Sequence, residues 1–181
     1  MAKGMTERTG VKSSVDEKKL PIETRISECG DRLLSTLGGV LDDIPESSQG
    51  PQRLATTLGI DKVLASRILK AVRTDDSLCA VHRMPGPDPL RRFVKASSSK
   101  GLTKERALAA NEAIASYERL ITVEIGDRSA LEAVLSAWVP EARRDFQMRR
   151  KQSAYRSMSQ LKGVAVQTYA ETAFLRPSDR D

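Results

Sequence analysis

Few residues of this chain combine the types and the spacing that catalysis or metal binding requires. His82 is the only histidine among 181 residues, and it lies beside Arg83 in a proline-rich stretch, where we expect a surface or turn residue and not a catalytic base. Cys29 and Cys79 are far apart and form no CxxC pair, so they indicate neither a disulfide framework nor a zinc site. We expect both thiols to be reduced and part of the core.

The acidic residues indicate no active site either. Asp42 and Asp43 are adjacent, as are Asp75 and Asp76, and neighbouring side chains on a helix point to different sides. Helix capping or solvated charge is the simpler role for such pairs. The chain also has no glycine-rich phosphate-binding motif and no HExxH zinc motif. The sequence therefore predicts a protein that is not an enzyme, with no catalytic residues, no metal and no cofactor.

Positive charge is concentrated in the middle of the chain. The net charge is +6, and residues 51–100 hold ten Lys and Arg against four Asp and Glu, whereas residues 1–50 hold seven against nine. A concentrated basic surplus attracts a phosphate backbone, although many basic stretches are only solvated helix faces.

The hydrophobic pattern predicts an all-α protein. Residues 1–20 are polar and without apolar periodicity, and we expect a disordered leader there and a disordered tail at 177–181. Apolar residues at steps of three and four from 22 to 44 predict a helix, which the pair Gly38 and Gly39 weakens or breaks. The sequence shows no membrane span and no signal peptide, so we expect a cytoplasmic protein that does not associate with a membrane.

Residues 51–72, PQRLATTLGIDKVLASRILKAV, predict two helices joined by a short turn. Ala55 is small enough for two steeply crossing helices to approach each other there. Gly59 can adopt the left-handed backbone conformation that ends the first helix, Ile60 can pack under the turn, and Asp61 can cap the second helix.

This set of residue types and spacings resembles the helix-turn-helix motif of bacterial DNA-binding regulators. The resemblance covers about 22 residues and departs from the pattern at Ala65, where a larger aliphatic residue is usual. No β-hairpin wing is recognisable after it, because HRMPGPDP is a proline-rich turn. The wider arrangement resembles the amino-terminal part of a bacterial regulator-like family in which such a motif precedes a helical region and a further domain.

Helical geometry separates two sides of the second predicted helix. With Leu64, Ala65, Ile68 and Leu69 directed inward, the outer side carries the residues at 62, 63, 66, 67, 70 and 73. The resemblance implies that the first turn and outer side of this helix meet base edges in the major groove. The residues that it implies as base contacts are Lys62, Val63, Ser66 and Arg67.

Phosphate contacts are expected at both ends of the motif. Gln52 and Arg53 lie at the positive end of the first predicted helix, and Thr56, Lys70 and Arg73 have side chains suited to phosphate oxygens. Asp61 is expected to cap its helix, since phosphate would repel its carboxylate.

Residues 102–176 predict a helical region that follows a first domain at 21–96. Thr103 is expected to cap a helix to about Ile125, with Leu108, Ala115, Leu120 and Ile121 directed inward, and Pro140 to begin a last long helix. Residues 163–175 fit either helix or strand. The apolar residues expected to share a face of the last helix are Ala142, Phe146, Ala154, Met158, Leu161 and Ala165.

Two functions remain open at the level of the sequence. The first is sequence-specific binding of double-stranded DNA by a transcriptional regulator associated with the nucleoid, acting as a homodimer through its carboxyl-terminal helices. The second is a helical protein–protein interaction module in which the helix-turn-helix is only structural. The basic stretch 143–156, with Phe146 and Tyr155 interleaved, fits either an anionic partner or a helix with a buried Phe146 and solvated arginines.

Overall fold

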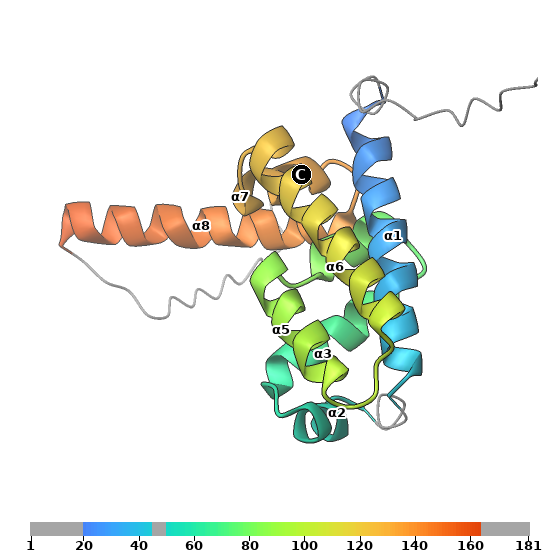
Figure 1. Cartoon of the computed structure of the whole chain (residues 1–181). Helices are drawn as coiled ribbons and strands as arrows, with labels where there is room; N and C mark the ends of the chain where they lie inside the picture. The colour runs from blue at the N-terminus through green and yellow to red at the C-terminus, as the bar shows by residue number, and fades with distance from the viewer. Residues whose placement is uncertain (1–19, 45–49, 164–181) are drawn as a thin grey trace, which may run out of the picture.

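The computed structural model describes residues 20–44 and 50–163, and every regular element within these ranges is helical (Figure 1). The all-α prediction is therefore confirmed. The predictions for residues 1–19, for 164–175 and for the tail at 177–181 lie outside the described residues. None of the described helices has the length and apolar content that crossing a bilayer requires. The elements in chain order are α1 (Ile22–Asp42), α2 (Pro51–Leu58), α3 (Lys62–Val72), α4 (Ser77–Arg83), α5 (Pro87–Ser98), α6 (Lys104–Arg119), the π-helical segment η3 (Leu120–Ile125), α7 (Arg128–Leu135) and α8 (Pro140–Lys162).

Local capping signals begin and end most of these helices. The side chain of Thr103 accepts a hydrogen bond from the backbone of Arg106 at the start of α6, and that of Asp127 accepts one from Ala130 at the start of α7. Pro140 occupies the first turn of α8, where its missing N–H leaves no hydrogen bond unmade. α1 is continuous through Gly38 and Gly39, so neither glycine breaks it.

α1 is the central packing element of the fold. It packs along α4 and α6, and its buried face includes Ile26, Leu33, Leu37 and Val40. The buried residues of the described helices form one contiguous apolar cluster that extends to Ala142 in the first turn of α8. Residues of the first predicted domain and of the region after it therefore share a core.

α6 buries a different face from the predicted one. Leu108 is 62% exposed and Ala115 is exposed, whereas Ala110, Ala113 and Ile114 are buried. The expectation that Leu108 and Ala115 point inward is therefore wrong, whereas the same expectation for Leu120 and Ile121 is confirmed, since both are buried in η3. Because this helix is rich in alanine, which is compatible with both faces, its sequence leaves the buried face poorly determined.

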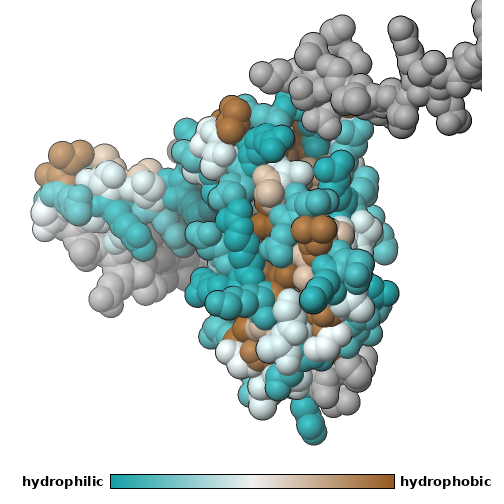
Figure 2. Space-filling model, in the orientation of Figure 1, coloured by the Kyte–Doolittle hydropathy of each residue, from teal (hydrophilic) through white to brown (hydrophobic). Residues whose placement is uncertain are grey.

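α8 projects from the rest of the fold (Figure 1). Among its described residues only Ala142 is buried, while Met158 is 49% and Leu161 81% exposed, so the apolar face predicted for this helix lies on the surface beyond its first turns, and Ala165 lies outside the described residues. The apolar residues near its far end lie on the surface, at the left of Figure 2. No other described element packs against this half of the helix, which explains the exposure.

Candidate functional site

The turn between α2 and α3 is built from three residues with distinct local roles. Gly59 ends α2 in the left-handed conformation, with φ 64° and ψ 32°, which glycine adopts without a Cβ penalty. The backbone N–H of Ile60 donates to the carbonyl of Ala55 at 3.1 Å. The Asp61 carboxylate then accepts hydrogen bonds from the backbone N–H groups of Val63, at 2.8 Å, and Leu64, at 3.2 Å. These roles of Gly59 and Asp61 are as predicted.

Small residues lie where α2 and α3 pack together. Ala55 is 7% exposed and Ala65 is fully buried, together with Ile68 of α3 and Leu54 of α2. α1 also contacts α3, so the short Ala65 side chain is enclosed from a third helix. This packing fixes which side of α3 faces solvent.

The outer side of α3 is accessible. Lys62, Arg67 and Lys70 are exposed, Val63 is 65% exposed, and Ser66 is partly buried. Of the residues expected to contact phosphates, Arg73, Gln52, Arg53 and Thr56 are also exposed. The Thr56 hydroxyl donates to the backbone carbonyl of Gln52 at 3.0 Å, so it would have to turn away from that carbonyl to donate to a phosphate.

Six other arginines of the described residues have acidic partners. Arg83 pairs with Glu141 at 2.6 Å and Arg106 with Asp43 at 2.5 Å. Further pairs are Arg25 with Glu124, Arg91 with Glu118, and Arg128 and Arg149 with Glu132.

The cations of α2 and α3 differ from these arginines. Arg53, Lys62, Arg67, Lys70 and Arg73 form no ion pair with any residue that the structure describes. Their charge is therefore available to an external anion.

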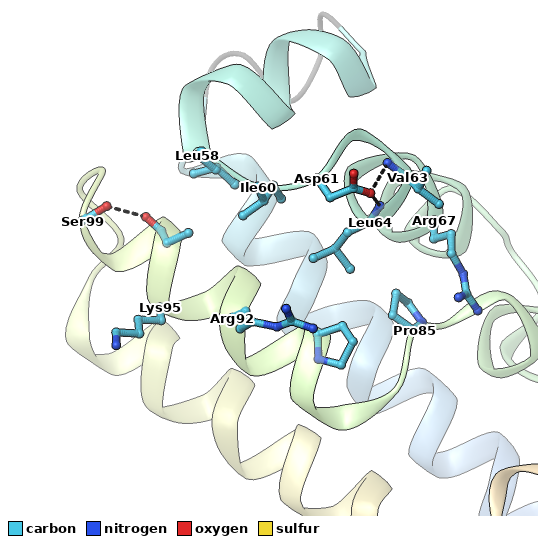
Figure 3. Close-up of a pocket in the computed structure, with 13 residues that line it drawn as sticks. Leu58, Ile60, Asp61, Val63, Leu64, Arg67, Pro85, Arg92, Lys95 and Ser99 are labelled. Carbon is cyan, nitrogen blue, oxygen red and sulfur yellow. Dashed lines mark hydrogen bonds between the residues drawn. The ribbon is translucent and has the colours of Figure 1, made fainter.

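A groove of about 700 Å³ lies between the α2–α3 turn and α5. Leu58, Ile60 and Leu64 point toward it, with Arg67 at one side and Arg92 of α5 at another (Figure 3). Val63 and Arg67, two of the predicted base contacts, line this groove, so the outer side of α3 forms one of its walls.

A smaller cleft of about 230 Å³ brings both acidic and basic residues of other helices close to α3 at Arg67 and Lys70. Arg67 and Lys70 line it together with Glu141 and Asp145 of α8. The pKa of Glu141 is lowered, chiefly by its hydrogen bond from Arg83 and to a smaller extent by the positive charge of Lys70. Lys70 is therefore less available to an external anion than Lys62.

His82 is not the surface residue that the sequence predicts. It belongs to α4 and is 8% exposed, with Nε2 3.3 Å from a carboxylate oxygen of Asp145, while Nδ1 is buried without a hydrogen-bond partner. The prolines that suggested a loop begin only at Pro85, so α4 continues through His82 and is covered by α8.

Arg92 and Lys95 of α5 are surface residues of the groove that the sequence analysis did not select. The segment PLRRFVKA carries the signal, since Leu90, Phe93 and Val94 recur at helical spacing and leave the cations on the opposite side of a helix. What the sequence lacks is the long-range packing that brings α5 beside the turn.

Comparison of the chain with known protein families, with curated proteins and with solved structures finds no match. Functional inference therefore rests on the residues and geometry described above.

Proposed function

We propose that this protein binds double-stranded DNA in a sequence-specific way and regulates transcription, with α3 of a helix-turn-helix entering the major groove. The observation that carries the proposal is the outer side of α3, which is exposed, cationic and without ion pairs to the described residues. With 11 residues, α3 is about 16 Å long. An α-helix with its side chains is about 10–12 Å across, so α3 fits the major groove, which is about 12 Å wide.

Base recognition is assigned to the first half of α3. Arg67 can donate two hydrogen bonds to the edge of a guanine, Val63 can contact a thymine methyl group, and Ser66 can donate to or accept from several bases. Lys62 can reach a guanine from the first turn.

Phosphate contacts would fix the position of α3 in the groove. Gln52 and Arg53 lie in the first turn of α2, where unpaired backbone N–H groups and the helix dipole attract anions. Thr56, Lys70 and Arg73 complete the proposed set. Because each neutralised phosphate releases counterions, the affinity should fall steeply with salt concentration.

Two copies would bind two half-sites about one helical turn of DNA apart. The projecting α8 offers a contact surface for a second copy, since Met148, Met158 and Leu161 are exposed along it. The pairing of two copies through α8 predicts a palindromic site.

Substitution of Arg67 tests this assignment. Arg67→Ala should lower the affinity for a cognate duplex by roughly tenfold or more, because a good base contact is worth about 1–3 kcal/mol, and should relax base preference at one position. Fluorescence anisotropy with a labelled duplex measures the affinity, and circular dichroism verifies the fold.

Lys104→Ala is the matched control, since Lys104 is exposed in the first turn of α6 and has no ion pair with described residues. An Arg67→Ala variant that binds DNA as tightly and as selectively as the parent chain would refute the assignment.

The competing function is a helical protein–protein interaction module. The groove beside α3 favours it, since an apolar concave surface is typical of sites that receive a protein segment. Partner binding in a chain without DNA affinity would identify that class.

A further inference from the structure

The groove between the α2–α3 turn and α5 combines an apolar floor with a cationic rim. Leu58, Ile60 and Leu64 provide the floor, and the volume of about 700 Å³ lies within the range of about 300–1,000 Å³ that ligand pockets occupy. It is open to solvent between the two walls, as Figure 3 shows.

The residues that line the groove include three cations and one carboxylate. Arg67, Arg92 and Lys95 are exposed and form no ion pair with the residues that the structure describes. Asp61 is the one acidic residue that lines the groove, and its carboxylate accepts hydrogen bonds from the backbone N–H groups of Val63 and Leu64, the second and third residues of α3.

An occupant of this groove must therefore be apolar on one side and anionic beside it. A DNA duplex has the charge but presents too little apolar surface to cover the floor. An amphipathic protein helix with acidic residues next to its apolar stripe has both, and it can place side chains at steps of three and four into such a groove.

We propose that the groove docks an acidic amphipathic helix of a partner protein. Apolar side chains of that helix contact Leu58, Ile60 and Leu64, and its carboxylates approach Arg67 and Arg92. Charge complementarity steers the association and limits it to acidic partners.

The docked helix would also regulate DNA binding. Val63 and Arg67 form a wall of the groove and are proposed base contacts, so they cannot meet both partners at once. This competition rests on the proposed function, whereas the docking itself does not.

The test uses the full chain and a labelled synthetic peptide of about 16 residues, long enough to form a helix, with leucines at helical spacing and glutamates beside them. Fluorescence anisotropy measures its binding. We expect the peptide to bind, Arg92→Glu to weaken it by roughly tenfold, and Val63→Ser to weaken it by a smaller factor. Lys104→Glu makes the same change of charge outside the groove and should leave the affinity unchanged.

Specificity controls decide what occupies the groove. Three results would each overturn the proposal. The acidic peptide does not bind, a peptide of the same composition in scrambled order binds equally well, or Arg92→Glu leaves the binding of the acidic peptide intact. Displacement of the probe by a synthetic peptide of residues 164–181 would assign the groove to this chain itself. Self-association that Arg92→Glu abolishes would assign it to a second copy.

A DNA competition experiment separates the two proposals. Release of a bound duplex by the acidic peptide supports both. If the chain binds the peptide through Arg92 but has no affinity for DNA, the proposed docking is supported and the proposed function is refuted. Simultaneous binding of peptide and duplex would refute the competition.

Discussion

At the scale of single residues, the fold uses its basic side chains in two ways. Arg83 and Arg106 reach carboxylates on other helices, and these pairs connect elements that are distant in sequence. Lys62 and Arg67 have no acidic partner among the described residues. The difference lies in the neighbourhood of each side chain and not in its type.

The Arg83–Glu141 pair gives a pH-dependent prediction. Arg83 lowers the pKa of Glu141 in the folded state, so the pair stabilises the fold above the unfolded pKa of about 4.3 and loses that effect as the pH falls through the folded value. Both side chains are more than a third exposed, which limits the contribution to below about 1 kcal/mol. Glu141→Gln should lower the free energy of unfolding at pH 7, and the difference should be smaller at pH 3.

Urea denaturation at the two pH values measures this effect. Glu112→Gln is a suitable control, because Glu112 is exposed on α6 and has no ion pair with described residues. A Glu141→Gln deficit of the same size at both pH values would show that the charge of Glu141 is not its cause.

The residues that the sequence predicted well act locally. The caps at Asp61 and Thr103 bind backbone groups two or three positions away, so residue type and spacing are sufficient to identify them. The prediction that His82 lies on the surface was wrong because the environment of His82 depends on Asp145, which lies 63 positions further along the chain.

At the scale of elements, the existence of helices was easier to predict than the way they pack. Proline, glycine and capping residues mark the ends of α2, α3 and α8. The buried face of α6 was wrongly predicted because its alanines fit either side, and the choice is made by contacts with α1 and α5.

Two glycines of α1 test the packing between helices. A Cβ on Gly30 would lie 2.6 Å from the backbone oxygen of Ser77 in α4, whereas a Cβ on Gly38 would have only Val72 near it, at 3.8 Å. We expect Gly30→Ala to lower the free energy of unfolding by about 1–3 kcal/mol through overpacking. Gly38→Ala should raise it by roughly 0.5–1 kcal/mol, because alanine loses less backbone entropy than glycine in a helix.

Urea denaturation of the two variants compares the same substitution in one helix, so intrinsic helix propensity cancels between them. Equal changes in the free energy of unfolding would contradict the close approach of α1 and α4 at Gly30.

At the scale of the whole molecule, one packed body carries α3, the groove and the projecting α8 (Figure 1). The sequence indicated the cationic side of α3, because helical periodicity determines it. It did not indicate the groove, whose second wall is α5, or the acidic residues of α8 beside Lys70, since both depend on contacts between distant segments.

These neighbours add two features to the account of DNA binding. Glu141 and Asp145 share a cleft with Arg67 and Lys70 and would compete with a phosphate for Lys70, and the proposed docking groove shares Val63 and Arg67 with the proposed base contacts. A regulator whose recognition surface is also a docking surface can be switched by competition alone.

The most direct test of the central claim is a selection of genomic DNA fragments by the purified full chain at two salt concentrations. If α3 reads bases, the recovered fragments should share a sequence element, palindromic if two copies bind, and binding should weaken steeply at the higher salt concentration. Recovery of fragments without a shared element at either salt concentration, or of none, would contradict the claim.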